Sequence, residues 1–437
     1  MVYLAILIYN TLFPVGFLLY APLYLRKLMR RGGWRDGFGE RFGWIGGEKR
    51  ARIRALRAPI WVHAVSVGET QAALGFIRAW QEREPERGFV LSTTTSTGQA
   101  IARERAPAGV VAIYFPLDFW LCDLLALLAI RPRLLVIFEK EFWPTLMFLC
   151  RLRGIPTALV NGMMSDRSHR RYAKWRAVFG PVFRWFDAIC VQTETDAARV
   201  RAVTGPCERI HVCHTMKFDQ TPDPTAADVT PLLDRVFPAG DRVLLVAAST
   251  HPGEEAVMLA SYRELAVAHP NLRLVLVPRH HERTPEIVAD IAAASLDHVL
   301  RTSLSGSDSR HDVPVFVVNT TGELMSFLAA ADIVYVGKTL AGNTGGHNVI
   351  EPAIHGKAII TGTATENFRP VMEAFRADAA CIEVPDEAAF TAACRRLLDD
   401  PAARAALGAA ARATLAHHRG ATPRTIDLLQ PLAGSIS

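Results

Sequence analysis

Short apolar runs recur along the chain from residue 59 onward, and each is followed by a longer helix-like stretch. The runs are continuous rather than alternating, which is typical of strands buried on both faces of a parallel sheet. The first half of the chain predicts strands at 59–65, 88–93, 110–115, 133–138, 155–160 and 187–192. The second half predicts strands at 242–248, 272–277, 314–318, 332–336 and 358–361. Strands that alternate with helices indicate a doubly wound α/β fold.

The alternation stops between residues 218 and 241, where prolines and aspartates gather and no strand pattern remains. We interpret 221–241 as a linker between two Rossmann-like, doubly wound domains, 31–220 and 242–437. Two such domains are expected to face each other across a cleft, with ligands at the carboxyl ends of their strands. A final Ala- and Arg-rich helical stretch, about 386–430, closes the chain and can pack back on the first domain.

The amino-terminal segment, residues 1–30, is distinct from both domains. Residues 2–25 carry no charge, and the basic run RKLMRR follows directly. A secretory signal peptide has the opposite order of basic and apolar residues. The segment is long enough to span a bilayer, although an asparagine and two prolines interrupt it, and the alternative is a helix lying in the membrane interface. In either case the basic flank keeps the rest of the chain on the cytoplasmic side.

Charge and cysteine content limit the kinds of partner and of metal or disulfide site that we expect for this protein. The net charge of +6 and the pI of about 9.0 suit an anionic partner. The basic residues are scattered and form no recognised nucleic-acid module, so we expect no nucleic acid. The seven cysteines form no CxxC pair, which indicates reduced, buried thiols rather than disulfides or a zinc site. No HExxH motif occurs, and we expect no metal.

Polar side chains follow the predicted strands of the second domain. ASTHPGEE places Ser249, Thr250 and His251 after one strand, and VPRHHER places Pro278 and Arg279 after the next. Ligands of open α/β sheets bind at these strand ends, where a guanidinium suits a phosphate or a carboxylate. A solvated basic turn is the alternative for the second stretch.

Two further stretches of the second domain have the character of anion sites. TTGELM puts Thr321 and Gly322 at a helix start with Glu323 in its first turn, which fits either an anion site or simple capping. The glycine-rich loop 336–346 leads into HNVIEP, where Glu351 follows His347 by four residues and suits a pair of ribose hydroxyls. The loop matches neither the Walker pattern nor GxGxxG. These residues predict a nucleotide without fixing which one.

The first domain contributes acids at its strand ends. HAVSVGET places Glu69 where a strand turns into a helix, as a complement to the helix dipole or as a general base. FEKEFWP places Glu139 after another strand, with a solvated loop acid as the alternative, and HTMKFD brings Lys217 to the end of the domain. The basic stretch 161–176 suits phosphate or anionic lipid.

These motifs share one order along the chain. They are GERFG (39–43), HAVSVGET, FEKEFWP, MKFD, STHPGEE, VPRHHER, TTGELM and GGHN followed by Glu351. On them the chain resembles the 3-deoxy-D-manno-octulosonic acid (Kdo) transferases of lipopolysaccharide assembly, from the apolar segment to near the carboxyl end. The resemblance implies a GT-B fold and an inverting transfer of Kdo from CMP-Kdo, a substrate, to the lipid A precursor (lipid IVA). It implies no cofactor, and a place on the cytoplasmic face of the bacterial inner membrane.

The resemblance also implies roles for individual residues. Glu69 matches the general base, and Glu139 and Lys217 match positions that stabilise the transition state. The positions that match CMP-binding segments are Pro278, Arg279, Thr321, Gly322, Glu323, Asn348, Val349, Ile350 and Glu351. Further candidates, for the acceptor or for loop shape, are Ser66, Gly68, Ser249, Thr250, His251, Gly346 and His347.

Some positions depart from the family's pattern. Lys338 stands where a glycine usually follows VG, NVIEP replaces NPLE, and CHTMKFD replaces GSLKFD. NGMMSDRS lacks one arginine of the usual pattern. The departures affect loop shape and acceptor detail more than nucleotide identity. Two other functions stay open at this point: a GT-B transferase or epimerase that uses a UDP-sugar, and a non-catalytic membrane protein that binds anionic lipid.

Overall fold

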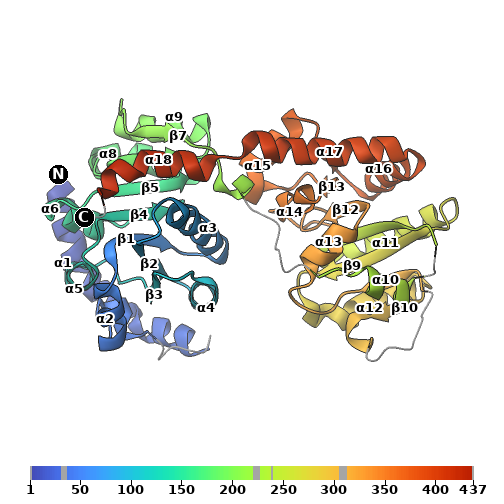
Figure 1. The fold of residues 1–437 in the computed structure, drawn as a ribbon, viewed down its shortest axis with the longest axis horizontal. Coiled ribbons are helices and arrows are strands. Elements are labelled where there is room, and N and C mark those ends of the chain that lie inside the picture. Colours follow the sequence, from blue (N-terminus) through green and yellow to red (C-terminus); the bar gives the residue numbers. More distant parts are fainter. Residues whose placement is uncertain (1, 31–36, 220–226, 238–239, 305–312, 436–437) are drawn as a thin grey trace. The chain divides into compact units, whose positions relative to one another are not determined.

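The computed structural model describes residues 2–30, 37–219, 227–237, 240–304 and 313–435. The chain forms two compact units, one of Met1–Asp219 with Gly420–Ser437 and the other of Gln220–Arg419. Each unit has one sheet of parallel strands with helices packed on it (Figure 1). The prediction of two doubly wound α/β halves is confirmed.

The sheet of the first unit has the strand order β3-β2-β1-β4-β5-β6-β7, with every pair parallel. Its strands are β1 (Arg57–Ala64), β2 (Arg87–Thr93), β3 (Val110–Tyr114), β4 (Leu134–Phe138), β5 (Thr157–Gly162), β6 (Ala188–Val191) and β7 (Ile210–Val212). Strand β7 was not predicted, because it is a three-residue edge strand with two half-buried positions. The other strands match the apolar runs within a few residues.

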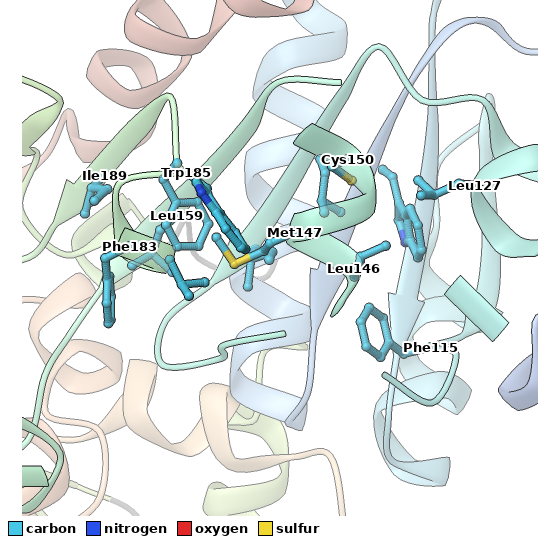
Figure 2. Close-up of a cluster of buried hydrophobic side chains, with 14 of the residues drawn as sticks. Phe115, Leu127, Leu146, Met147, Cys150, Leu159, Phe183, Trp185 and Ile189 are labelled. Carbon is cyan, nitrogen blue, oxygen red and sulfur yellow. The ribbon is translucent and has the colours of Figure 1, made fainter. Parts of the chain in front are cut away.

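Two apolar clusters cover the two faces of this sheet. Successive strand residues face opposite sides, so that Trp61 belongs to one cluster and Val62 to the other. Figure 2 shows part of the first cluster, which joins helix residues such as Leu127 of α5 and Met147 of α6 with strand residues such as Leu159 and Ile189. Burial on both faces explains why the apolar runs are continuous.

The helices of the first unit include the last helix of the chain. They are α1 (Val2–Arg30), η1 (Gly39–Phe42), α2 (Gly47–Arg54), α3 (Val67–Arg83), α4 (Ser96–Arg105), α5 (Trp120–Ile130), α6 (Pro144–Leu152), α7 (Asp166–Lys174), α8 (Arg176–Phe183), α9 (Glu194–Thr204), η2 (Met216–Asp219) and α18 (Ala421–Ala433). The carboxylate of Asp219 accepts hydrogen bonds from the backbone of Gly420 (2.7 Å) and Thr422 (2.6 Å). These bonds tie the start of α18 to the end of η2.

The second unit repeats the architecture with the order β10-β11-β9-β8-β12-β13-β14, again all parallel. Its strands are β8 (Val243–Thr250), β9 (Leu272–Pro278), β10 (His298–Leu300), β11 (Val315–Val317), β12 (Ile333–Val336), β13 (Ala358–Gly362) and β14 (Ile382–Val384). The edge strands β10 and β14 were not predicted, because each has three residues and two half-buried positions.

The helices of the second unit surround its sheet. They are α10 (Thr230–Val236), α11 (Glu254–Ala266), η3 (His281–Arg283), α12 (Thr284–Ala293), η4 (Arg301–Ser303), α13 (Leu324–Ala330), α14 (Ile350–Ile354), η5 (Glu366–Phe368), α15 (Arg369–Ala377), α16 (Glu387–Asp399) and α17 (Pro401–His418). Helix α10 lies in the stretch interpreted as a linker. It belongs to the second unit. Val236 and the following Phe237 are fully buried, and Phe237 packs edge-on against Phe316 (6.4 Å between ring centroids).

Helix α1 lies against the first unit, next to α6 and α8. The side chain of Asn10 donates a hydrogen bond to Thr145 Oγ1 (2.9 Å) and accepts one from the backbone of Trp120 (3.0 Å). On other positions of α1, large apolar side chains are exposed, among them Leu7 (64%) and Leu12 (61%). Among the residues that the structure describes, no helix is long and apolar enough to cross a membrane. The spanning alternative for residues 2–25 therefore has no support here.

Candidate functional site

The first predicted acid, Glu69, lies at the start of α3, directly after β1. Its carboxylate accepts hydrogen bonds from the Ser66 hydroxyl (2.9 Å, at Oε1) and from the backbone of Val65 (2.9 Å, at Oε2). Ser66 Oγ in turn accepts the backbone N–H of Glu69 (3.3 Å). Ser66 and Glu69 therefore cap the start of α3 reciprocally, as in a capping box, except that the carboxylate accepts the backbone N–H of Val65 instead of that of the N-cap residue Ser66. The capping alternative is thus realised, and it also holds the half-buried carboxylate in one orientation.

Gly68, in the same turn, is exposed, and a side chain added there would meet no atom within 4 Å. The packing of the first unit therefore gives no structural reason for a glycine at this position.

The second acid, Glu139, follows β4, the neighbour of β1. Its backbone has a φ of +58°, a conformation that a glutamate rarely adopts and that costs about 1–3 kcal/mol. Its N–H donates to the carbonyl of Val160 (2.9 Å), and its Oε1 accepts a long hydrogen bond from Asn161 Nδ2 (3.4 Å). Non-glycine residues strained in this way gather at functional sites.

Asn161 connects Glu139 to the segment that carries Lys217. It is buried at the end of β5, and its Oδ1 accepts the backbone N–H of Met216 (3.0 Å). Its own carbonyl accepts a hydrogen bond from Gln192 Nε2 (2.9 Å). One side chain therefore contacts the end of β4 and the start of η2. The sequence interpretation missed Asn161, and the signal available was a lone asparagine at a strand end, in LVNG.

Electrostatics shows that the three predicted residues of the first unit lie close together. Burial raises the pKa of Glu139; the charge of Lys217 opposes this rise and the charge of Glu69 adds to it. Burial lowers the pKa of Lys217, while Glu139 and Glu69 oppose the fall. The three residues therefore lie within reach of one another's charge at the carboxyl edge of β1 and β4.

Glu141 extends this cluster and was not predicted. Burial first, and then the charges of Glu69 and Glu139, raise its pKa to about 7. Glu139 and Glu141 also line a small pocket of about 30 Å³, whose apolar wall includes Met164 and Tyr172. That volume holds about two water molecules and is too small for a sugar.

In the second unit, the buried Glu254 organises the carboxyl edge of the sheet from the first turn of α11. Its carboxylate accepts hydrogen bonds from Tyr335 Oη (2.7 Å) and from the backbone of His251, Lys338, Thr339 and Leu340 (2.8, 2.8, 2.8 and 3.0 Å). One carboxylate thus fixes the turn after β8 and the loop after β12.

Backbone conformation shows how tight this edge is. Ser249 and Lys338 both have a positive φ, of 55° and 66°. A side chain added at Gly337 would meet the carbonyl oxygen of Ser249 at 2.6 Å. Lys338 therefore occupies a conformation that favours glycine.

The adjacent Glu255, also fully buried, fixes the turn after β9. It accepts two hydrogen bonds from the Arg283 guanidinium (2.9 and 3.2 Å) and one from Thr250 Oγ1 (2.8 Å). A fork of this kind is geometrically specific. The predicted candidate Thr250 is therefore a buried structural residue that links the ends of β8 and β9.

Two predicted histidines meet at this edge. His251 Nε2 and His347 Nε2 lie 3.0 Å apart, and their rings are 5.1 Å apart at an angle of 28°. Burial first, and then the charges of His251, Arg279 and Lys338, lower the pKa of His347 to about 4. Arg279 and Lys338 are therefore near the pair, and the residues predicted after three different strands come together. Gly346, beside His347, has a φ of +71°.

Asn348 and Glu351 form a second polar group next to Arg279. Asn348 Nδ2 donates to Glu351 Oε1 (3.2 Å). Burial raises the pKa of Glu351, while the bond from Asn348 and the charge of Arg279 oppose the rise. Between them, Val349 and Ile350 are fully buried, so their side chains belong to the core rather than to a ligand surface.

The TTGE stretch follows β11, which β9 separates from β8 in the sheet. Helix α13 begins at Leu324, so Glu323 is its N-cap residue and not part of its first turn. The Glu323 carboxylate is held by Arg301 (3.0 Å) and by the hydroxyl of Thr320. The helix start predicted at Gly322 is therefore two residues early, and after the glycine-rich loop helix α14 begins at Ile350. Both helices are short, which weakens their dipoles as a source of anion binding.

Among the described residues, no group of three or more His, Cys, Asp or Glu side chains is arranged to hold a metal ion.

Comparisons with known proteins add to this geometry. Residues 36–220 match the family model described as 3-Deoxy-D-manno-octulosonic-acid transferase (kdotransferase). The chain is 32% identical over 400 residues to the 3-deoxy-D-manno-octulosonic acid transferase of Haemophilus influenzae, covering 91% of this chain and 92% of that protein. It is 32% identical over 418 residues to the enzyme of the same name from Bordetella pertussis, covering 94% and 95%.

Among solved structures, the chain resembles a glycosyltransferase from Rickettsia africae. The TM-score is 0.58 at 10% identity, over 86% of this chain and 98% of that one. At this identity the likeness shows the fold alone.

Proposed function

The chain belongs to the 3-deoxy-D-manno-octulosonic acid (Kdo) transferase family, and on that premise we propose that it moves Kdo from CMP-Kdo to a lipid A precursor with Glu69 as the general base. The family makes it a glycosyltransferase of lipopolysaccharide biosynthesis. The observation that carries the finer proposal is the cluster of Glu69, Glu139 and Lys217 at one sheet edge.

In this proposal Glu69 takes the proton of the attacking acceptor hydroxyl. The hydroxyl oxygen forms a bond to the anomeric carbon of Kdo, and the bond from that carbon to the phosphate oxygen breaks. Its electron pair leaves with the phosphate, and the configuration inverts. A hydroxyl has a pKa far above that of a carboxylate, so the proton moves as the new bond forms. The bonds from Ser66 and Val65 leave lone pairs on both Glu69 oxygens, so the cap and the base are compatible.

Lys217 and Glu139 act as a pair beside this base. Burial works against a charge on Lys217, and the Glu139 carboxylate supports it. A desolvated ammonium is well suited to the Kdo carboxylate or to charge that develops in the transition state. Asn161 positions both residues through its contacts with Glu139 and Met216.

The nucleotide occupies the carboxyl edge of the second sheet. Arg279, beside Glu351 and His347, contacts the phosphate, and Glu351 with Asn348 receives the ribose hydroxyls. The other proposed CMP-binding positions are Pro278, Thr321, Gly322, Glu323, Val349 and Ile350. Charge on the leaving phosphate is balanced by cationic side chains, so the reaction needs no metal and no other cofactor.

The membrane contact is made by α1 together with the basic helix α7. Exposed leucines of α1, Leu7, Leu12 and Leu19 among them, offer an apolar stripe to the lipid interface. Helix α7 carries arginines and a lysine that suit anionic headgroups or a phosphorylated acceptor. The enzyme then works at the cytoplasmic face of the bacterial inner membrane.

Acceptor-dependent release of CMP tests the proposal. Detergent-purified protein receives CMP-Kdo generated in situ, with and without the lipid A precursor, and CMP and UMP are compared as competitors. Release that depends on the acceptor and is inhibited by CMP rather than UMP supports the donor and the acceptor. Inhibition by UMP alone would contradict the CMP-Kdo assignment and favour a UDP-sugar. Lipid binding without release of any nucleotide would favour the non-catalytic alternative.

A further inference from the structure

The contact between His251 and His347 restricts where their protons can be. At 3.0 Å, the two facing Nε2 atoms form a hydrogen bond only if one carries a proton and the other offers its lone pair. Two neutral imidazoles meet this condition as opposite tautomers. One ring then has its second nitrogen, Nδ1, unprotonated and available as an acceptor.

This arrangement can hold one further proton without breaking. A proton added at the free Nδ1 leaves both Nδ1 atoms as donors and keeps the bond between the Nε2 atoms. A second added proton would set N–H against N–H at 3.0 Å. The pair therefore has two states that keep the contact, neutral and singly charged, and the charged state carries one more N–H donor.

The surrounding charges decide which state holds before a ligand binds. The groups that act on the pair are Glu254 of α11, Arg279, His280 and Arg283 after β9, and Lys338 after β12. Burial is the largest cause and lowers the pKa of both histidines; Glu254 opposes it at His251, while the other groups add to it. The oxygens of Glu254 already accept five hydrogen bonds. The pair is therefore neutral near pH 7.

We propose that the His251–His347 pair is a proton-accepting part of the phosphate site, which takes up one proton from solvent when a nucleotide phosphate binds beside Arg279. The inference rests on the proposed function, because it takes the ligand to be CMP and its sugar conjugate. An anion at this edge reverses the local potential and favours the charged state. The phosphodiester of the donor has one negative charge, and released CMP has nearly two at neutral pH. When the anomeric C–O bond breaks, the protonated pair balances the charge that the phosphate gains.

Calorimetry of CMP binding tests this inference. The titration is made with the full chain at about pH 7.5, where a phosphate monoester with a second pKa of about 6 is almost fully ionised. Repeating it in buffers of different ionisation enthalpy gives the number of protons taken up with each CMP. We expect between about half and one proton for the wild type, and an affinity that weakens as pH rises, since the complex holds more protons than its parts. Cytidine, which has no phosphate, is expected to bind without proton uptake.

Three variants separate the pair from other histidines. His251→Gln and His347→Gln each remove the shared proton site, and we expect proton uptake to fall to near zero in both while CMP still binds. His417→Gln changes an exposed histidine of α17 and should keep the wild-type uptake.

The outcomes distinguish this inference from the function it rests on. CMP binding without proton uptake in the wild type, or uptake that persists in both pair variants, overturns the role of the pair and leaves the proposed function intact. Binding of UMP in place of CMP overturns the donor assignment itself. Equal uptake with cytidine and CMP also overturns the inference, because the phosphate is then not the trigger.

Discussion

Replacing Glu254 by glutamine should loosen the edge of the second sheet where the nucleotide is proposed to bind. The carboxylate receives three hydrogen bonds at Oε1, from Tyr335, Thr339 and Leu340, and two at Oε2, from His251 and Lys338. A glutamine amide can place its oxygen where Oε1 accepts three hydrogen bonds, but its NH₂ group then takes the place of Oε2 and faces the backbone N–H groups of His251 and Lys338. Each buried donor left unsatisfied costs about 1–3 kcal/mol, so Glu254→Gln should lower the free energy of unfolding of the second unit by about 2–6 kcal/mol.

The distribution of tryptophan provides the assay. The eight tryptophans of the chain all fall within residues 34–185, in the first unit. In a urea titration, tryptophan fluorescence therefore follows the first unit, whereas far-UV circular dichroism follows both units. Glu254→Gln should leave the fluorescence transition unchanged. The part of the circular dichroism transition that reports the second unit should move to lower urea concentration.

A matched substitution on the same helix gives the control. Glu264 of α11 has 60% of its side chain exposed and pairs with Arg395, so Glu264→Gln should cost no more than about 1 kcal/mol. If Glu254→Gln unfolds at the same urea concentration as Glu264→Gln, the hydrogen bonds of Glu254 do not hold this edge together. A shift of the fluorescence transition would also refute the reasoning, because it would place the effect in the first unit.

Three further predictions concern the first unit. Asn161→Ala should lower kcat more than it changes KM, which steady-state CMP release measures. It should also destabilise the first unit by about 1–3 kcal/mol, because the Met216 N–H loses its acceptor, and the fluorescence transition in urea measures this loss. The pKa of Glu141 is raised to about 7 in the folded protein, so the protonated carboxyl stabilises the folded state below about pH 4.5, and this stabilisation is lost as the pH rises to 7. The urea midpoint of the first unit should therefore fall less over this pH range in Glu141→Gln than in the wild type. Leu12→Glu in α1 should lower the protein's sedimentation with vesicles that contain anionic lipid by about tenfold, because the variant loses apolar burial and gains a negative charge. As a control, Leu152→Glu, which changes an exposed leucine of α6, should leave sedimentation unchanged.

The sequence was most informative about the central strands. Their apolar runs are continuous because both faces of each sheet are covered, so pattern alone located them within a few residues. The strands it missed, β7, β10 and β14, are three-residue edge strands whose mixed burial leaves no clear pattern. Helix α10 was missed for a different reason. The prolines and aspartates around it are typical of a linker, whereas its burial depends on contacts with distant residues such as Phe316.

The site was predictable as a set of strand ends, but not as a set of contacts. Glu69, Glu139 and Lys217 come together because their elements end at the same edge of one sheet. The partner of each residue depends on tertiary structure, which local pattern does not report. For this reason Asn161 and Glu141 were missed, and Glu254 and Glu255 could not be recognised as fully buried acids that hold loops in place. The full burial of the Val349 and Ile350 side chains, within a segment that matches a CMP-binding one, was likewise not evident from the sequence.

The most direct test of the central claim separates the two roles of Glu69. Glutamine at position 69 can keep hydrogen bonds to Ser66 and Val65 but cannot take the acceptor's proton, whereas Ser66→Ala weakens the cap and keeps the carboxylate. The measurement is the rate of acceptor-dependent CMP release by both variants and the wild type, with CMP affinity as a check on binding. The account predicts a loss of about 10²–10⁴-fold for Glu69→Gln with unchanged CMP affinity. It predicts a loss of stability of about 0.5–2 kcal/mol for Ser66→Ala, with most of the turnover kept. Wild-type turnover in Glu69→Gln would contradict the account and leave Glu69 as a helix cap.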